Sequence, residues 1–395
     1  MKKIALLCSA FALAAAGSAQ AQLSMQMGNG WSFSFAGNVN AFYVYEKVSN
    51  SGATFGAPGG IVGNVGEGSS IRTGLLPAFA VLDAKGKEGN TDLGVHFGFA
   101  PQIQTGGGHD NFGNGTQAGA QIDMRQVYLT VGGSWGQILA GREIGLYQRQ
   151  NILNDQTLFG IGATGGNFGN AGGTTLGRIG FGYVYPNFNA QMTYSTPGGR
   201  PGQLSIGLFD PSTNNGYDIV KTPRVEAEAT YTIGKSLLWL GGMVQNHKES
   251  ASGVSKSAYG GSGGVKFGTA QFSVVGSGYY GQGIGTTLLF LNGRSGSEES
   301  TANRKSYGYI GQIAFTPAAS KLTVAGSYGE SILKNASDEA AFKTHNGLVS
   351  GGVYYQATKS LKVVGEGDYA WTKLSGSGVK KNSSIAGAFG LMLFF

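Results

Sequence analysis

Histidine is the residue type in this sequence best suited to metal binding or acid–base chemistry, and the chain has 4 histidines. His96, His109, His247 and His345 lie far apart, and none is spaced with a Cys, a Glu or a second His as a metal site requires. We therefore expect no metal site, no cofactor and no enzymatic activity. A Ser-His-Asn hydrolase arrangement stays open, because such sites assemble in space from distant residues.

Two pairs of carboxylates recur at a spacing of two residues, Glu226 with Glu228 and Glu366 with Asp368. In an extended strand this spacing places both members on one face. Paired carboxylates can perform general acid–base chemistry. We interpret both pairs instead as the polar lining of a lumen.

Arginines occupy the polar parity of several predicted strands. Arg72 and Arg178 each lie on the polar, lumen-facing side of their predicted strands. Arg125 also has this orientation, with Tyr128 on the opposite face, and Arg142 shares the inner face of its strand with Gly136, Ile138 and Ala140. Arginines that face carboxylates across a narrow wet gap create a transverse field, which orients polar solutes and disfavours apolar ones. These side chains are therefore candidates for a transport filter.

The strands that would position these residues recur along the whole sequence. Apolar and polar residues alternate with a period of two, and not 3.6, so the fold class is all-β. In the first such segment, aromatic residues lie at both ends of the apolar face, as at the two interfaces of a membrane. The segments are 31–46, 72–83, 93–99, 122–131, 135–142, 178–185, 225–233, 237–244, 257–267, 272–280, 305–315, 322–328, 348–355, 361–371 and 385–395.

The last of these segments has a continuous apolar face and ends on Phe395. Its members Phe389, Leu391 and Leu393 share that face with Phe395. A strand with one continuous apolar face and no covering element suits a barrel whose outer face contacts lipid. Outside the first residues no apolar run of about 18 residues occurs, which excludes helical membrane spans.

The first residues are typical of a signal peptide. Residues 1–21 combine a basic start, a short apolar run and a small-x-small cleavage site, which predicts a mature barrel of residues 22–395. The chain has 28 basic and 21 acidic residues, and removal of Lys2 and Lys3 leaves 26 basic residues, a net charge of +5. This excess is too small to indicate a nucleic-acid partner. The 71 glycines show no collagen-like period.

Short and long connections alternate between the predicted strands. Tight turns such as 186–187, 234–235 and 268–269 contrast with longer loops such as 102–120 and 143–176, the asymmetry of an outer-membrane barrel. Segments 189–195 and 203–209 could be two strands. If they form one interrupted strand, the total is about 16 antiparallel transmembrane strands and the alternation stays intact.

The sequence resembles the Gram-negative general porins over essentially its whole mature length. The best local match runs from Arg125 through Gly136 to Tyr147, and resembles the fourth and fifth strands of the family, which lead into an inward-folded third loop. The resemblance implies a homotrimeric diffusion channel in the bacterial outer membrane, with loop 102–120 latching onto a neighbouring subunit. It also implies that Phe395, with Leu393, Leu391 and Phe389, is the sorting signal read by the barrel-assembly machinery.

Loop 143–176 is the predicted constriction loop. It carries apolar residues such as Leu146, Ile152 and Phe159 that are costly to leave in water, so we expect it to fold into the lumen. An extracellular flap stays open as an alternative. By resemblance, Arg125 and Arg142 match the family's constriction arginines and Asp155 matches one loop acid. The family's second loop acid is missing from 155–160, which implies a weaker arginine–acid filter.

Three classes of function fit these features. The leading hypothesis is a water-filled channel for passive diffusion of small hydrophilic solutes and ions, surrounded by outer-membrane lipid. The alternatives are a solute-selective channel and a structural or adhesive barrel. Because Arg72, Arg125, Arg142 and Arg178 outnumber Asp155 at the predicted pore constriction, we expect a weak preference for anions.

Overall fold

The structure is a computed structural model that describes residues 23–28, 30–49, 57–63, 66–103, 122–165, 174–212, 221–248, 255–294, 302–376 and 380–395. The predicted signal peptide, 1–21, and nearly all of the predicted latching loop, 102–120, lie outside these residues. In the described part of the chain, no helix is long and apolar enough to cross a membrane.

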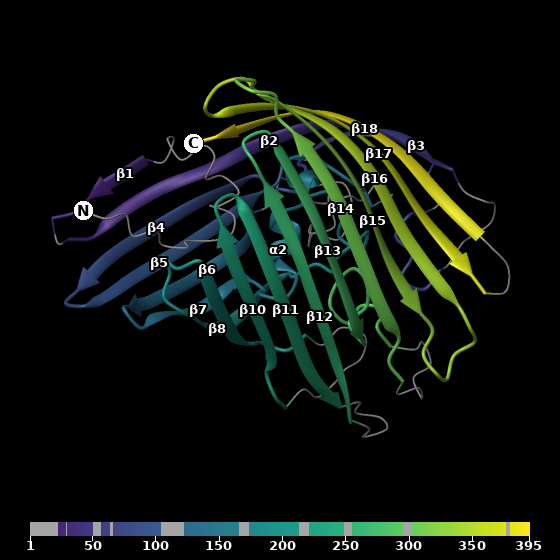
Figure 1. Cartoon of the computed structure of the whole chain (residues 1–395), viewed down its shortest axis with the longest axis horizontal. Helices are drawn as coiled ribbons and strands as arrows, with labels where there is room; N and C mark the ends of the chain where they lie inside the picture. Colours follow the sequence, from purple (N-terminus) through teal and green to yellow (C-terminus); the bar gives the residue numbers. More distant parts are fainter. Residues whose placement is uncertain are drawn as a thin grey trace, which may run out of the picture.

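The described chain forms one antiparallel sheet that closes on itself (Figure 1). Strand β2 pairs with β4 on one side and with β18 on the other, and each strand from β4 to β18 pairs with the next. With β2, these fifteen strands make a ring of sixteen, which confirms the predicted count. The strands are β1 (Leu23–Gln26), β2 (Ser32–Ser49), β3 (Glu67–Arg72), β4 (Phe79–Glu88), β5 (Thr91–Pro101), β6 (Ile122–Gly133), β7 (Gly136–Ile144), β8 (Phe188–Ser195), β9 (Gly202–Phe209), β10 (Arg224–Ile233), β11 (Ser236–Lys248), β12 (Ser255–Gly268), β13 (Phe272–Gln282), β14 (Lys305–Phe315), β15 (Leu322–Lys334), β16 (Lys343–Gln356), β17 (Leu361–Ser375) and β18 (Lys380–Phe394).

The count of sixteen is right, but the predicted assignment around residue 190 is wrong. Residues 178–185 form no barrel strand, because Gly177, Gly180 and Gly182 have positive φ angles of 56°, 80° and 146° that interrupt an extended chain. Segments 188–195 and 202–209 are instead two full strands, β8 and β9. Residues 186–187 are therefore the end of a long loop that runs from 145 to 187, and the predicted loop 143–176 was too short.

The predicted strand 72–83 is interrupted in the structure. Strand β3 pairs with the later half of β2 and β4 pairs with its earlier half, so the two share one place in the ring. Between them, Pro77 has no N–H to give to a ladder. The carbonyls of Leu76 and Pro77 accept hydrogen bonds from the side chains of Asn40 and Asn38, at 3.0 Å each.

The two faces of the barrel wall differ in the way that the alternation predicts. On β18, Ile385, Phe389 and Leu393 are 64%, 58% and 49% exposed, whereas Met392 and Phe394 are buried on the inner face. Phe395 closes the ring: its N–H donates to the carbonyl of Gly37 at 3.0 Å, and Gly37 N–H donates back at 2.8 Å. The short turns, the first described residues and the C-terminus share one end of the barrel (Figure 1).

Candidate pore constriction

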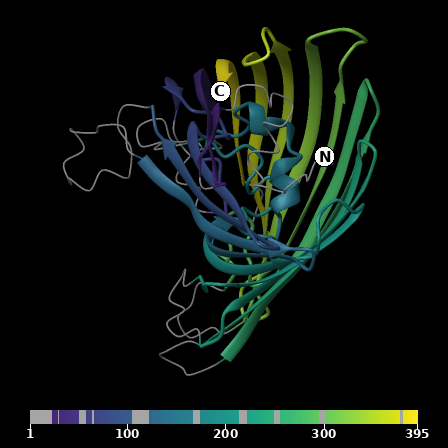
Figure 2. The same ribbon diagram turned by 90° about the vertical axis from the view of Figure 1, so that its left-hand side faces the viewer.

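The described parts of the long loop 145–187, residues 145–165 and 174–187, lie inside the barrel. They carry the short helices α2 (Arg149–Leu153) and η2 (Gln156–Phe159), which the strands enclose in Figure 2. Apolar loop residues Ile152, Leu158 and Ile161 are buried in one cluster with inner-wall residues such as Phe42 and Val364. Burial of these side chains against the wall is the physical reason that the loop folds inward.

The first part of the loop is anchored to β10 and β11. The backbone N–H of Tyr147 donates to a carboxylate oxygen of Glu226 at 2.9 Å, and Arg149 forms an ion pair with Glu228. The indole N–H of Trp239 donates to the side-chain oxygen of Asn151 at 2.9 Å. The carboxylate pair Glu226 and Glu228 therefore holds the loop, while still lying on one inner face as predicted.

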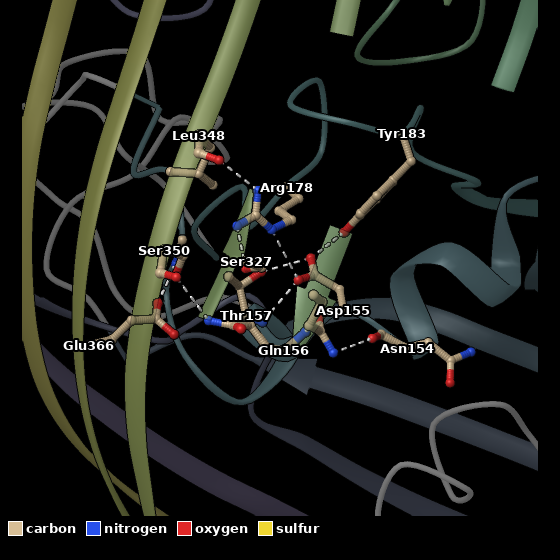
Figure 3. A network of polar contacts seen from close by, with 12 residues as sticks. Asn154, Asp155, Gln156, Thr157, Arg178, Tyr183, Ser327, Leu348, Ser350 and Glu366 are labelled. Atoms are coloured by element: carbon tan, nitrogen blue, oxygen red, sulfur yellow. Dashed lines mark hydrogen bonds and ion pairs between the residues drawn. The ribbon is translucent and has the colours of Figure 1, made fainter. Parts of the chain in front are cut away.

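The second anchor joins two of the predicted constriction residues, Asp155 and Arg178 (Figure 3). The Nε of Arg178 lies 3.7 Å from a carboxylate oxygen of Asp155, and both side chains are 0% exposed. Arg178 donates to the carbonyl of Leu348 at 2.9 Å and to the hydroxyl of Ser327 on the barrel wall. Room for this guanidinium comes from Gly329 of β15, whose Cβ would lie 3.1 Å from an Arg178 nitrogen.

Asp155 is enclosed by donors from its own loop. It accepts hydrogen bonds from the backbone N–H of Thr157 at 2.9 Å, from the Thr157 hydroxyl at 2.7 Å and from the phenol of Tyr183 at 3.0 Å. Burial raises the pKa of Asp155 and lowers the pKa of Arg178, while the charge of each partner opposes the shift of the other. The pair is a structural contact within the loop, and does not face another charge across water.

The turn after helix η2 is anchored to β17 by Glu366. One carboxylate oxygen of Glu366 accepts the backbone N–H groups of Ile161 and Gly162, both at 2.7 Å, and the other accepts the phenol of Tyr354 at 2.8 Å. A Cβ on Gly160 would lie 2.0 Å from this carboxylate, so the close approach requires glycine here. Asp368, the other predicted member of this pair, is buried on the same inner face.

Arg72 binds the far side of the same loop. One of its terminal nitrogens donates to the carbonyl of Thr174 at 2.9 Å. Nearby, the N–H of Leu75 donates to the carbonyl of Gly160 at 3.0 Å, and the hydroxyl of Thr164 donates to Glu46 on β2. The interruption between β3 and β4 therefore supplies backbone groups that hold the loop.

Arg125 lies at a β-bulge, where β6 has one residue more than its partner strand β5. Its Nε is 2.8 Å from a carboxylate oxygen of Asp123, and its guanidinium lies 5.8 Å from the ring centre of Phe188. The extra residue at the bulge shifts the alternation of faces along β6, so the prediction that Arg125 and Tyr128 lie on opposite faces of the strand is wrong. Tyr128 points inward, where its ring stacks on buried His96 at 4.5 Å.

The predicted inward position of Arg142 is wrong. Arg142 is exposed, and its strand neighbour on the same face, Ile138, is 38% exposed. Across the sheet this face continues with Met192, which is 62% exposed, so it is the outer face. Strand β7 instead turns Glu143 inward, where it accepts from Gln126 at 2.9 Å and 3.0 Å.

Two further loops enter the barrel, and the sequence interpretation missed both. Asn346 donates to the carbonyl of Gly59 at 2.8 Å, and the N–H of Ile61 donates to the hydroxyl of Thr372 at 3.0 Å. In the loop after β13, Ile284 and Phe290 are buried in a cluster that includes Tyr147. The sequence signal for these inward loops was the presence of apolar residues inside glycine-rich segments, as in loop 145–187.

Two lysines of the inner face also escaped the sequence interpretation. The ammonium of Lys362 lies 3.7 Å from the ring centre of Phe159 in helix η2 of the loop, and Lys266 is half-buried on β12. Among the residues that the structure describes, neither lysine forms an ion pair with an acid. Strand parity was the signal that could have found them.

Solved structures share this fold at low sequence identity. The outer-membrane channel DcaP of Acinetobacter baumannii has 14% identity and a TM-score of 0.69, and the match covers 94% of this chain and 99% of that chain. The anion-selective porin from Comamonas acidovorans has 14% identity, a TM-score of 0.60, and coverage of 92% and 100%. OmpF of Salmonella typhi, in complex with daunomycin, has 12% identity, a TM-score of 0.57, and coverage of 93% and 100%.

No curated protein sequence matches this chain at a significant level. A sequence model of the family described as Gram-negative porin matches residues 8–377, which is most of the chain. Given this match and the closed sixteen-strand barrel, the chain belongs to the Gram-negative porin family and is a passive diffusion channel of the bacterial outer membrane.

Proposed function

We propose that this porin passes small hydrophilic solutes and ions with a weak preference for anions. The observation that carries this proposal is the way in which the charged side chains of the inner face are paired. Glu226, Glu228 and Glu366 are buried and bonded to Arg224, Arg149 and loop amides. Lys266 and Lys362 have no such partner in the described chain, so positive charge is less compensated along the diffusion path.

The predicted constriction residues divide into two roles under this proposal. Arg72, Asp155 and Arg178 set the shape of the constriction, because their polar atoms bind the loop or the wall. Arg125, whose side chain is 20% exposed, contributes to the potential in the path. Arg142 contributes nothing to it, since it lies on the outer face.

The reversal potential in planar bilayers under a KCl gradient tests the anion preference. We expect Lys362→Glu and Lys266→Glu to shift the reversal potential toward cation preference, and the shift to shrink as salt rises, because the Debye length falls from about 10 Å at 0.1 M. Lys359→Glu is the matched control, with the same charge change in the exposed turn three residues before Lys362. Equal shifts in all three variants would contradict the proposal.

A solute-selective channel is the second candidate. The observation that favours it is the set of loops inside the barrel, since described residues of loops 57–63, 145–187 and 283–294 contact the inner wall or one another. Single-channel recordings separate the two candidates. Large ohmic steps that no solute blocks support general diffusion, whereas small steps that one class of solute blocks support selectivity.

We further infer that the protein assembles as a homotrimer and that Phe395 with its outer-face partners is read by the barrel-assembly machinery. The family match supports both inferences. A heat-sensitive high-mass band on electrophoresis and conductance steps in threes are the expected results for the trimer. A monomer in mild detergent, measured by light scattering, would contradict it.

A further inference from the structure

Lys362 is a half-buried cation of the inner wall that no anion neutralises. It is the second residue of β17, directly after the short turn 357–360. Its Cα partners on the two neighbouring strands, Gln356 and Met392, are uncharged. Within the described ranges, Lys362 forms no ion pair and no hydrogen bond. Because withdrawing a charge from water without a partner is costly, an anion that reached this ammonium would be bound favourably.

Aromatic rings surround the ammonium in place of an anion. It lies 3.7 Å from the ring centre of Phe159 in helix η2 and 6.0 Å from that of Phe394 on β18. The two rings are nearly perpendicular, at 69°, and their centres are 6.3 Å apart. A ring face attracts a cation but gives it no charged hydrogen-bond acceptor. The rings therefore position the ammonium and leave its hydrogen-bond donors available.

Apolar surface beside the ammonium is also open to the lumen. Phe159 and Leu153 of loop 145–187 are only partly buried, although both pack against the buried cluster that contains Val364 and Phe394. The cation thus comes from the wall and the apolar surface from the loop, and the two meet where the loop contacts the wall. A ligand that fits both has an anionic group joined to an apolar body.

We propose that Lys362, Phe159 and Leu153 bind solutes in which a carboxylate is attached to an aromatic ring. The ammonium forms charge-assisted hydrogen bonds with the carboxylate. The ring of the solute packs on Phe159 in an offset or edge-to-face arrangement, which aromatic pairs prefer. The proposal rests on the proposed function, because the solute must diffuse into the lumen, and it names the class of solute that the channel retains longest.

Lys266 on β12 shows what charge alone would do. It too is half-buried on the inner face, and its Cα partners Leu237 and Val275 are uncharged. In the part of the chain that the structure describes, no aromatic ring contacts its ammonium. The two lysines therefore match in charge and burial and differ in their aromatic neighbours, so Lys266 is the control position for the site.

The test compares three small solutes as blockers of the channel in planar bilayers. Benzoate has both the carboxylate and the ring, acetate has only the carboxylate, and benzamide has only the ring. Each is added to KCl at constant ionic strength, and the concentration that halves the single-channel conductance is measured. We expect this concentration to be at least about fivefold lower for benzoate than for either other solute. Equal values for benzoate and acetate, or for benzoate and benzamide, would overturn the proposal.

Charge variants locate the site. We expect Lys362→Gln to raise the half-blocking concentration of benzoate at least about fivefold, because the carboxylate loses its cation. Lys266→Gln removes the same charge elsewhere on the inner wall and should preserve the advantage of benzoate over acetate. Equal losses in the two variants would show general electrostatic attraction and overturn the site.

Two further variants separate binding from damage to the local fold. Phe159→Leu keeps an apolar side chain and the lysine, and should lower the advantage of benzoate over acetate about two- to threefold while the value for acetate stays the same. Lys362→Arg keeps a cation that can lie over the ring, and should retain most of the block by benzoate. A loss in Lys362→Arg as large as that in Lys362→Gln would show that the charge does not bind the solute, and would contradict the proposal.

Reversal potentials of the same variants under a KCl gradient distinguish this site from the general anion preference. Absence of any anion preference, with block by benzoate intact and dependent on Lys362, would contradict the proposed function and support the site. A clear anion preference with equal half-blocking concentrations for benzoate and acetate would contradict the site alone.

Discussion

Strand β18 and the loop 145–187 both carry residues that the sequence singled out, but only β18 matches its prediction residue by residue. On β18 each side chain faces either lipid or the barrel interior, and the alternation along the strand alone determines which of the two it faces. In the loop, Asp155 and Arg178 were expected to face water and instead bind each other without exposure. In a strand, the local sequence is enough to predict which way each side chain faces. In a folded loop, the role of a side chain depends on the part of the barrel wall that the loop contacts.

The largest effect is expected at the end of β18. Phe395→Ser removes a ring that lies 5.2 Å from the ring of Phe35, and, if the assembly machinery reads it, lowers the yield of membrane-inserted protein severalfold. Phe35→Ser removes the same ring contact and leaves the C-terminus intact. Quantitative blots of outer-membrane fractions compare the two, and equal losses would assign the effect to packing alone.

The next effect sharpens the view of the loop. Arg178→Met leaves Asp155 buried without its cation, and breaking a buried ion pair costs about 3–5 kcal/mol. We expect the loop to leave the wall and single-channel conductance to rise, with added current noise. The double variant Arg178→Met with Asp155→Leu removes both charges and should return conductance toward the wild-type value.

A conductance that stays at the wild-type value in Arg178→Met would show that the other anchors suffice. Lys359→Met serves as the control, since it removes a charge from an exposed turn. Crosslinking of a cysteine introduced at Asn154, whose side chain bonds only within the loop, to the barrel wall, in both variants, reports the position of the loop independently of current.

A smaller effect separates two arginines that the sequence placed together. Arg125→Gln should shift the reversal potential modestly toward cation preference, because Asp123 then loses its partner 2.8 Å away. Arg142→Gln removes the same charge from the outer face and should leave the reversal potential unchanged. Equal shifts of the reversal potential in the two variants would indicate that Arg142 lies along the diffusion path and would contradict its assignment to the outer face.

The smallest expected effect concerns pH. Burial raises the pKa of Asp155, so the folded loop binds a proton more readily than the released loop. In the pH range between the ordinary aspartate pKa of about 4 and the raised value, acidification therefore stabilises the anchored loop. The loop-to-wall crosslinking yield should stay constant or rise as pH falls from 8 to about 5, and Asp155→Asn should abolish any rise. A falling yield in the wild type would contradict this sign.

Local alternation in the sequence was enough to predict the barrel class and the apolar outer face of β18. The count of sixteen strands was right although the segments around residue 190 were assigned wrongly, and the inward loop was predicted from its apolar residues. The alternation succeeded because lipid and lumen impose opposite demands on successive side chains, and each residue reports its own side. The resemblance at 125–147 added the family, which the match over residues 8–377 confirms.

Only the tertiary structure decided what the charged residues do. The bulge at Arg125 reversed the parity of Tyr128, the positive φ angles of Gly180 and Gly182 turned an expected strand into loop, and the wall at Leu348 and Ser327 took Arg178 out of water. None of these follows from spacing, since one extra residue inverts a period of two. Whether a charge lines the pore or holds a loop depends on segments more than a hundred residues away, which meet only when the barrel closes.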